Sequence, residues 1–304
     1  HKEYRRQRQM CIRDSLWENK SHSYQQLAQA ASQAGAALAA LQAAPGKVIG
    51  LLLPRGDSLL IAQAAITASG AAWLPFDSEI PIDRAESSLL SANAIGLVTT
   101  RAWKDHTAQI TTPVWFIEDL LDPNAERTTP QRPSPSDPAY IIYTSGSTGK
   151  PKGITISQSN ICHFLRSENH VLQIQESDRV YQGFSAAFDM SFEEIWISYL
   201  VGATLWIAPP YVITDPDAVE AALAQEHITV LHAVPTLVAL LSQLPSHLRL
   251  INLGGEACPD ALAQQLTGKN RLIFNTYGPT ETTVTATLAK LEKDQKVTIG
   301  LPLP

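Results

Sequence analysis

Short apolar runs alternate along this chain with longer segments in which apolar positions recur at helical spacing. Residues 48–53 (VIGLLL) form a continuous apolar run that Pro54 ends, which predicts a buried parallel strand. Residues 24–41 are rich in alanine and carry apolar side chains at helical spacing, which predicts a helix. The same patterns predict further strands at 72–74, 95–98, 114–117, 140–143, 153–157, 180–184, 204–207, 229–232, 248–253 and 271–274, and helices at 57–69, 84–92, 159–167, 192–199, 217–226, 236–244 and 260–266. This alternation predicts an α/β fold with parallel sheets that are covered by helices on both faces.

Two segments lack this periodicity and indicate how the chain is organised. Residues 1–15 (HKEYRRQRQMCIRDS) are polar and basic, and we interpret them as a disordered or non-native tail; a nucleic-acid-binding arm is the alternative. Residues 123–138 are rich in Pro, Ser and Thr and predict a connecting loop. The loop predicts a boundary between a first α/β portion at 16–138 and a second at 139–304.

The overall composition narrows the partners that this chain can bind. Hydrophobic residues make up 44% and charged residues 17% of the 304 positions, and the net charge of −6 gives no general attraction for nucleic acid or an anionic membrane. No apolar run is long enough to span a bilayer, and Cys11, Cys162 and Cys258 have no paired spacing that would indicate disulfides or zinc. These features predict a cytoplasmic protein, and any phosphate that it binds must be held by a local site.

The segment that follows the predicted strand at 140–143 has the chemistry of a phosphate-binding loop. Residues 144–153 (TSGSTGKPKG) combine glycines, which let backbone N–H groups approach an anion, with hydroxyl groups and two lysines. The spacing is not that of a nucleotidase P-loop, because only Ser147 and Thr148 separate Gly146 from Gly149. A flexible Gly/Ser hairpin is the alternative. The residues expected to contact phosphate are Thr144, Ser145, Gly146, Ser147, Thr148, Gly149, Lys150 and Lys152.

Residues 143–153 (YTSGSTGKPKG) resemble the signature loop of the adenylate-forming superfamily, which includes acyl-CoA synthetases, luciferases and the adenylation domains of nonribosomal peptide synthetases. Residues 66–84 (ITASGAAWLPFDSEIPIDR) resemble a second segment of that family, in the family's order. The resemblance covers residues 16–304 and implies two parallel-rich sheets with helices on both faces, as in the N-terminal subdomains of the adenylate-forming fold. It also implies that the sequence stops before the β-barrel of that fold is complete and before its small C-terminal domain.

Residues 188–191 (FDMS) resemble the FDxS motif of amino-acid adenylation domains, whose aspartate pairs with the α-ammonium group of the substrate. An ammonium group that enters an apolar pocket loses its water and needs a carboxylate partner, which Asp189 would supply. A helix N-cap is the alternative role for Asp189. The motif predicts an amino-acid substrate rather than a fatty or aryl acid.

Two further segments resemble the family's adenine-binding and metal-binding motifs. Residues 254–257 (GGEA) correspond to a turn that lies against the adenine, although a plain strand-to-helix turn is the alternative. Residues 275–281 (NTYGPTE) resemble NxYGPTE, which implies that Asn275 binds the adenine amino group and Tyr277 stacks on the ring. Thr280 would bond the α-phosphate, and Glu281 would hold Mg²⁺. The expected nucleotide contacts outside the loop are thus Gly255, Glu256, Ala257, Asn275, Tyr277, Gly278 and Thr280, and the expected catalytic residues are Thr144, Lys152 and Glu281.

The resemblance implies that an amino-acid carboxylate reacts with ATP to give aminoacyl-AMP and pyrophosphate. Catalysis would rest on positioning and on charge neutralisation by the loop lysines and Mg²⁺ rather than on a protein nucleophile. The activated amino acid would pass to the phosphopantetheine thiol of a peptidyl carrier domain, with a condensation domain as a further partner. Because the family's ribose-binding aspartate and catalytic lysine find no match, we expect little activity from residues 1–304 alone. The alternatives are an acyl- or aryl-CoA synthetase and a non-catalytic nucleotide-binding fragment.

The family's selectivity pocket can be carried over by position. It consists of Asp189, Met190, Glu193, His232, Asn252, Gly254, Thr276, Val284 and Thr285. Asp189 and Glu193 are four residues apart and so share one face of a helix. A carboxylate such as Glu193 is costly in a pocket for an apolar side chain, so we predict a polar or cationic substrate side chain, such as that of a diamino acid. Pairing of His232 with Glu193 would weaken this inference.

Overall fold

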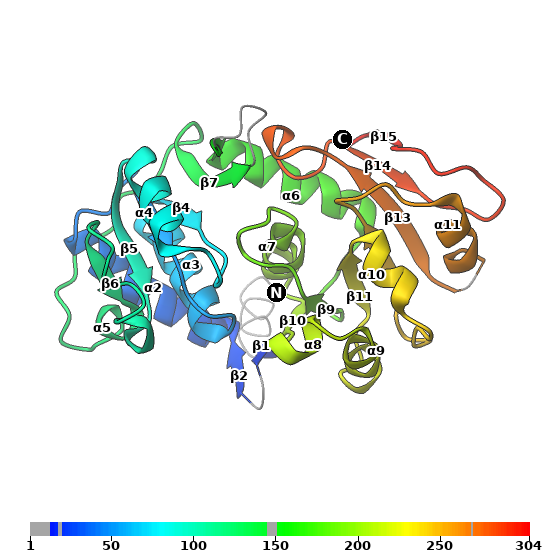
Figure 1. Cartoon of the computed structure of the whole chain (residues 1–304), viewed down its shortest axis with the longest axis horizontal. Coiled ribbons are helices and arrows are strands. Elements are labelled where there is room, and N and C mark those ends of the chain that lie inside the picture. The colour runs from blue at the N-terminus through cyan, green and yellow to red at the C-terminus, as the bar shows by residue number, and fades with distance from the viewer. Residues whose placement is uncertain (1–12, 18–19, 145–150, 269) are drawn as a thin grey trace, which may run out of the picture. The chain divides into compact units, whose positions relative to one another are not determined.

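The computed structural model describes residues 13–17, 20–144, 151–268 and 270–304. The chain divides into two compact units. The N-terminal unit consists of Gln25–Ile161 and Ser185–Ala187. The C-terminal unit consists of three segments: the described residues up to and including Tyr24, then Cys162–Phe184, then Phe188–Pro304. Each unit is built around its own sheet (Figure 1).

The N-terminal unit contains a six-stranded sheet in the order β6-β5-β3-β4-β7-β8. Neighbouring strands are parallel except β7 and β8, which form an antiparallel pair. The strands are β3 (Val48–Leu51), β4 (Ala72–Pro75), β5 (Ala94–Thr99), β6 (Val114–Phe116), β7 (Pro138–Thr144) and β8 (Lys152–Ser157). The helices are α2 (Tyr24–Ala40), α3 (Asp57–Ser69), α4 (Ile82–Ser91), α5 (Ile117–Leu120) and the 3-10 helix η1 (Arg101–Trp103).

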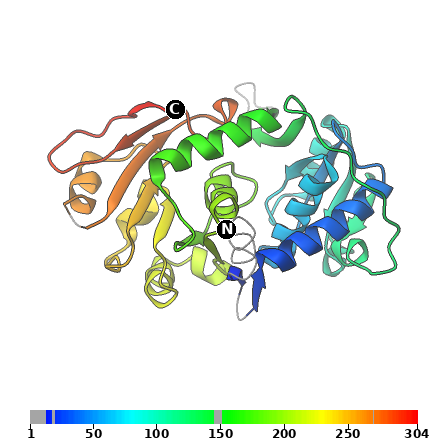
Figure 2. The ribbon, with the colours of Figure 1, turned by 180° about the vertical axis from the view of Figure 1, so that it is seen from behind.

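Helices cover both faces of this sheet, as the predicted apolar strands require. Every residue of β3 and β4 is buried, which is typical of parallel strands with helices on both sides. Helix α2 lies behind the sheet in Figure 1 and in front of it in Figure 2. Helix α3 packs closely against α2, because a β-carbon on Gly35 of α2 would lie 2.9 Å from the carbonyl oxygen of Ala65 in α3. On the other face, Leu89 of α4 packs directly over Gly50 of β3.

The C-terminal unit contains a nine-stranded sheet in the order β15-β14-β13-β12-β11-β9-β10-β1-β2. Strands from β13 through β1 are parallel, while β2, β14 and β15 run antiparallel to their neighbours. The strands are β1 (Arg13–Trp17), β2 (Lys20–Ser23), β9 (Arg179–Gln182), β10 (Thr204–Ile207), β11 (Val230–Ala233), β12 (Leu250–Leu253), β13 (Leu272–Tyr277), β14 (Thr287–Lys290) and β15 (Leu301–Pro302). The helices are α6 (Gln158–Leu172), α7 (Ser191–Val201), α8 (Pro210–Ile213), α9 (Pro216–Gln225), α10 (Pro235–Leu240), α11 (Asp260–Leu266) and the 3-10 helix η2 (Thr280–Thr282).

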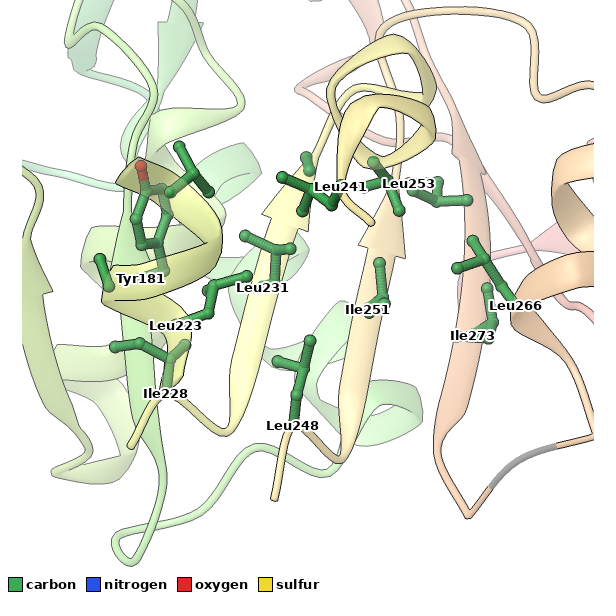
Figure 3. Close-up of a cluster of buried hydrophobic side chains, with 14 of the residues drawn as sticks. Tyr181, Leu223, Ile228, Leu231, Leu241, Leu248, Ile251, Leu253, Leu266 and Ile273 are labelled. Carbon is green, nitrogen blue, oxygen red and sulfur yellow. The ribbon is translucent and has the colours of Figure 1, made fainter. Parts of the chain in front are cut away.

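Strand alternation gives the C-terminal sheet an apolar face and an opposite face that carries two buried polar residues. Leu231, Ile251 and Ile273 lie in register on β11, β12 and β13 and point into one apolar core together with side chains of α9, α10 and α11 (Figure 3). Full burial of each such side chain stabilises the fold by roughly 1.5–3 kcal/mol. Because successive residues of a strand point to opposite faces, His232 and Asn252 face away from this core.

The structure confirms the predicted α/β class: two sheets are flanked by helices, and the described residues form no closed barrel. Two details differ from the sequence expectations. Residues 13–15, which we assigned to a tail, belong to β1, whose polar sequence RDSLW lacks an apolar run but pairs through its backbone with β10 and β2. The Pro-rich segment 123–138 lies within the N-terminal unit rather than at its edge, and there the Thr128 N–H donates to the Ala36 carbonyl at 3.0 Å.

Candidate functional site

Polar side chains converge on the face of the C-terminal sheet that is opposite its apolar core. His232 on β11 and Asn252 on β12 are direct neighbours in the parallel register, and both are buried. They lie towards the carboxyl ends of their strands, where open parallel sheets bind ligands. Helix α6 lies behind these strands in Figure 1 and in front of them in Figure 2, on the side away from α9, α10 and α11. Two glutamates, one on α6 and one on α7, complete the cluster.

Glu193, in the first turn of α7, is the centre of this polar cluster. Its Oε2 lies 2.9 Å from Nδ1 of His232 and accepts a hydrogen bond from Nδ2 of Asn252, also at 2.9 Å. Its Oε1 accepts a hydrogen bond from Oγ1 of Thr285 at 3.0 Å. The side chains of Glu193 and His232 have no exposed surface. The structure therefore brings together four residues that the resemblance assigned to one pocket, and it pairs His232 with Glu193.

Glu168 on α6 is a second carboxyl group in this cluster, and the sequence did not identify it. Its side chain is fully buried and lies close enough to Glu193 and Asn252 to interact with both, yet neither of its carboxyl oxygens has a well-formed hydrogen bond. Burial, and then repulsion from the Glu193 carboxylate, raise the pKa of Glu168 well above its usual range. The cluster thus holds two carboxyl groups within a few side chains of each other.

Asp189 stands just before α7 and is partly buried. Its carboxylate interacts with the side chain of Thr280, while its Oδ2 is buried and has no hydrogen-bond partner in the described part of the chain. Burial, followed by the nearby Glu193 carboxylate, raises the pKa of Asp189 above its usual value. Met190, not Asp189, occupies the N-cap position of α7, and no side-chain hydrogen bond caps that helix. Asp189 therefore has an unfilled acceptor that an ammonium group could occupy.

Close packing around the turn after β12 brings three more of the expected pocket residues together. A β-carbon on Gly254 would lie 2.5 Å from Oγ1 of Thr276 and 2.9 Å from Cε of Met190. The Thr276 hydroxyl donates to the carbonyl oxygen of Leu253 at 3.0 Å. The next residue, Gly255, has a φ of +77°, a left-handed conformation that other residues adopt only with strain. Glycine is therefore required at both positions for this packing.

Val284 and Thr285 follow η2 through an unusual stretch of backbone. Thr283 and Val284 both have a φ of +66°, in the left-handed region that β-branched residues rarely adopt. This conformation accompanies burial of the Val284 side chain and the hydrogen bond of the Thr285 hydroxyl to Glu193. Backbone strain at this position is thus coupled to the polar cluster.

The residues expected to contact adenine lie at the ends of β12 and β13. Asn275 donates its side-chain amide to the carbonyl oxygen of Thr298 at 2.8 Å. Tyr277 is 54% exposed, which leaves its ring accessible for stacking. Glu256 accepts hydrogen bonds from the backbone N–H and the hydroxyl of Thr236. The turn formed by Gly255, Glu256 and Ala257 is exposed.

The expected phosphate and metal contacts on this unit lie in and beside η2. Gly278 precedes η2, and a β-carbon there would lie 2.6 Å from the backbone nitrogen of Ala286. Thr280 interacts with Asp189, and the Glu281 side chain is exposed. The described residues contain no group of three or more His, Cys, Asp or Glu side chains that could hold a metal ion. A single exposed carboxylate fits Mg²⁺, because Mg²⁺ keeps waters and binds substrate phosphates rather than all-protein cages.

The predicted phosphate loop belongs to the N-terminal unit. Thr144 ends β7 and Lys152 begins β8, and the two residues are paired across these antiparallel strands. The connection therefore joins two strands, whereas a nucleotidase P-loop joins a strand to a helix. The other expected phosphate contacts, Ser145, Gly146, Ser147, Thr148, Gly149 and Lys150, lie outside the described residues.

Comparison with known protein families identifies the class of this protein. The model of the AMP-binding enzyme family matches residues 3–304, so the chain belongs to this family and, with it, to the adenylate-forming ligase superfamily. The match confirms the resemblance that the loop at 143–153 first indicated. No helix among the residues that the structure describes is long and apolar enough to cross a membrane.

Two curated relatives show what this chain is similar to. The delta-poly-L-ornithine synthetase of Acinetobacter baumannii (strain AB307-0294) is 56% identical over 286 residues, which are 94% of this chain and 22% of that protein. The dimodular nonribosomal peptide synthase of Bacillus subtilis (strain 168) is 34% identical over 270 residues, which are 85% of this chain and 11% of that protein. The chain therefore spans 22% or less of the length of these two relatives.

Solved structures share the fold. A four-domain nonribosomal peptide synthetase bound to AMP and glycine matches 98% of this chain and 22% of its own length, with a TM-score of 0.86 and 28% identity. The N-terminal subdomain of Klebsiella oxytoca NpsA, in complex with 3-hydroxybenzoyl-AMSN, matches 99% of this chain and 77% of its own length, with a TM-score of 0.84 and 26% identity. These neighbours bind AMP or an aryl-acid analogue, so the fold by itself leaves the acid substrate open.

Proposed function

We propose that this chain binds ATP and an amino acid within an enzyme that activates the amino acid as aminoacyl-AMP. The observation that carries the proposal is the partly buried Asp189 carboxylate, whose Oδ2 has no hydrogen-bond partner. The α-ammonium group of an amino acid would pair with this oxygen and favour the ionised carboxylate, which burial disfavours. The substrate would thereby be fixed at one end, with its own carboxylate free to react.

The proposed reaction depends on the positioning of the two substrates rather than on a nucleophile supplied by the protein. An oxygen of the amino-acid carboxylate attacks the α-phosphorus of ATP, a new P–O bond forms, and pyrophosphate leaves with the electrons of the broken bond. Tyr277 and Asn275 would hold the adenine, and Thr280 would bond the α-phosphate. Lys152 and Thr144 would act on the phosphates, and Glu281 would hold Mg²⁺, which neutralises phosphate charge.

The activated amino acid would then pass to the phosphopantetheine thiol of a peptidyl carrier domain. A condensation domain would be a further partner in nonribosomal peptide synthesis. Support comes from a 34%-identical relative named as a dimodular nonribosomal peptide synthase and from a structural neighbour that is a four-domain nonribosomal peptide synthetase. We also propose a cytoplasmic location, which the lack of any paired cysteine spacing in the sequence supports.

The proposed substrate has a polar or cationic side chain, and L-ornithine is the candidate. Glu193 places a fully buried carboxyl group in the first turn of α7, just after Asp189, where an apolar substrate side chain would bring no charge to pair with it. His232 contacts only Oε2 of this group. The 56%-identical relative is named as a delta-poly-L-ornithine synthetase, which supports the same side chain.

Activation of an aryl acid is the second candidate, because the similar NpsA subdomain was solved with a 3-hydroxybenzoyl analogue. An aryl acid brings no positive charge to the unfilled Oδ2 of Asp189. The buried carboxylate would then lower the stability of the fold and would gain no favourable interaction with the substrate. Asp189 therefore favours an amino acid.

ATP–pyrophosphate exchange by the full-length gene product tests the proposal, with amino acids and aryl acids offered one at a time. Exchange should depend on an amino acid, and Asp189→Asn should reduce it by about 30- to 5,000-fold for every amino acid, because a buried ammonium loses its charged partner. Asp215→Asn is the matched control, since Asp215 is a true helix N-cap and asparagine caps equally well. Exchange that depends on aryl acids alone, or that survives Asp189→Asn, would contradict the proposal. Absence of exchange with every acid would indicate a non-catalytic nucleotide-binding protein.

A further inference from the structure

Glu168 is a buried carboxyl group to which the chemistry proposed for Asp189 gives no role. It projects from α6, it has no exposed surface, and neither of its oxygens has a hydrogen-bond partner among the residues that the structure describes. A buried carboxyl group without partners is costly, and an apolar side chain of similar volume would pack there at lower cost. The position therefore indicates a partner that comes from outside the fold.

The described neighbours of Glu168 give it no well-formed hydrogen bond, although Asn252 lies close enough to interact with it. Nδ1 of His232, Nδ2 of Asn252 and Oγ1 of Thr285 all point to the Glu193 carboxylate. Oδ1 of Asn252 is itself a buried acceptor without a partner. Among the residues that the structure describes, the interactions of Glu168 and Glu193 involve no lysine or arginine. The cluster thus holds two carboxyl groups and a buried amide oxygen, and its described interactions include no cationic donor from lysine or arginine.

We propose that Glu168 is a specificity-determining residue that binds, together with Glu193, the side-chain ammonium group of a diamino-acid substrate. This inference rests on the proposed function, in which Asp189 binds the α-ammonium group of the same molecule. An ammonium group has three donors and no acceptor, which matches a cluster of acceptors. Among the described residues, the carboxyl oxygens of Glu168, Oδ1 of Asn252 and Nε2 of His232 are buried polar atoms of this cluster without a hydrogen-bond partner.

Asp189 precedes α7, Glu193 lies in its first turn, and the two carboxylates are close enough to interact. An extended chain of five single bonds, as between the two nitrogens of L-ornithine, spans about 6 Å. One diamino acid would therefore reach Asp189 with its α-ammonium group and the Glu168–Glu193 pair with its terminal one.

The raised pKa of Glu168 agrees with this role. Burial and the Glu193 carboxylate both disfavour the ionised form of Glu168 in the free protein. A bound ammonium group favours that ionised form. The Glu193 carboxylate also raises the pKa of Asp189, and the α-ammonium group would favour the ionised form of Asp189 in the same way.

Substrate selectivity of Glu168→Gln in the full-length gene product tests the inference. Glutamine keeps the size of the side chain and removes the charge. We expect kcat/KM for L-ornithine in ATP–pyrophosphate exchange to fall about 10- to 100-fold, because a charge-assisted hydrogen bond is lost. L-norvaline has the same carbon chain without the terminal amine, and its kcat/KM should stay unchanged or rise. An unchanged ratio of L-ornithine to L-norvaline would overturn the inference.

Glu194→Gln is the matched control, because Glu194 is also a fully buried glutamate in this unit but accepts hydrogen bonds from the Gly183 and Phe184 backbone. It should lower stability and leave the L-ornithine to L-norvaline ratio as in the wild type. If Glu168→Gln does not fold, the wild-type ratio decides: equal use of the two amino acids overturns the inference. Failure of the proposed function looks different, since the wild type would then respond to no amino acid at all.

Discussion

Glu193 and Glu194 are neighbours in the first turn of α7, and both are fully buried, yet their surroundings differ. Glu194 is held largely by backbone: it accepts hydrogen bonds from the N–H groups of Gly183 at 2.9 Å and Phe184 at 3.2 Å. The side-chain amide of Gln182 adds a third bond at 3.0 Å. Glu194 therefore ties the end of β9 to α7.

Glu193 is held by side chains instead, from His232, Asn252 and Thr285. It also faces Glu168, a second carboxyl group that has no hydrogen-bond partner. Backbone donors are fixed by the fold and fully satisfy a structural carboxylate, whereas the Glu193 region keeps acceptors unfilled. Such a region costs stability in the absence of a ligand, and that cost is typical of binding sites.

Glu193→Gln is the substitution with the largest expected effect on function. It should lower kcat/KM for L-ornithine by about 100-fold or more, because a buried ammonium group loses a charged partner. The free energy of unfolding should fall by less than in Glu194→Ala, since glutamine keeps one acceptor oxygen for the His232 and Asn252 donors. Exchange kinetics of the full-length gene product and urea unfolding of this chain measure the two effects. Equal losses in both would mean that Glu193 is a structural residue like Glu194.

Glu194→Ala should show the reverse pattern. Removal of the carboxylate leaves the Gly183 and Phe184 N–H groups without their acceptor, so the free energy of unfolding should fall by about 2–4 kcal/mol. Urea unfolding at constant pH measures this loss. In molecules that remain folded, the preference for L-ornithine over L-norvaline should be unchanged. A variant of wild-type stability would show that these backbone bonds do not hold β9 to α7.

The pH dependence of stability should distinguish Glu168 from a satisfied carboxylate. The folded-state pKa of Glu168 is raised above its unfolded value of about 4.3, so its stabilising contribution is complete at lower pH and is lost as pH rises through the raised pKa. Without ligand, the free energy of unfolding should fall with a slope of at most about 1.4 kcal/mol per pH unit from this group. Glu168→Gln should lack this part of the slope and should gain stability relative to the wild type as pH rises. Parallel pH profiles of the two proteins would contradict the raised pKa.

Thr285→Val has the smallest expected effect. It removes only the hydroxyl donor to Oε1 of Glu193, so it should cost about 0.5–1.5 kcal/mol in the free energy of unfolding. Thr285→Ser keeps the hydroxyl and is the control for the change in side-chain shape. A cost that is the same for serine and valine would assign the effect to packing near the strained backbone at Val284 rather than to the hydrogen bond.

Much of the fold can be predicted from local sequence patterns, because buried parallel strands have continuous apolar runs in their sequence. Residues 48–53 predict β3 for this reason, whereas β1, with the sequence RDSLW, is formed by backbone pairing at one side of a sheet and carries no such signal. The composition of residues 123–138 predicts a boundary, whereas the structure places them within one unit, a packing that composition cannot show. Sequence alone therefore predicts strands better than it predicts which segments pack together.

Sequence predicts those site residues that lie in or next to a recognisable motif, and it does not predict the site residues that lie outside the motifs. Glu193 was found through its position after FDMS, and the structure places it with His232 and Asn252. Glu168 was missed because the predicted helix ended at residue 167. The helix in fact continues to Leu172, and counting on from Phe164 by four residues would have placed a glutamate among core-facing positions. A charged residue at an apolar position of a helix was the available signal.

The most direct measurement is the ratio of kcat/KM for L-ornithine to that for L-norvaline in ATP–pyrophosphate exchange by the wild-type, full-length gene product. The two amino acids share the α-ammonium group that Asp189 would bind and differ only in the terminal amine that Glu168 and Glu193 would bind. A cluster of buried, unfilled acceptors for an ammonium group predicts a preference for L-ornithine of about 100-fold or more. A ratio near one, or a preference for L-norvaline, would contradict a cation-binding role for this cluster.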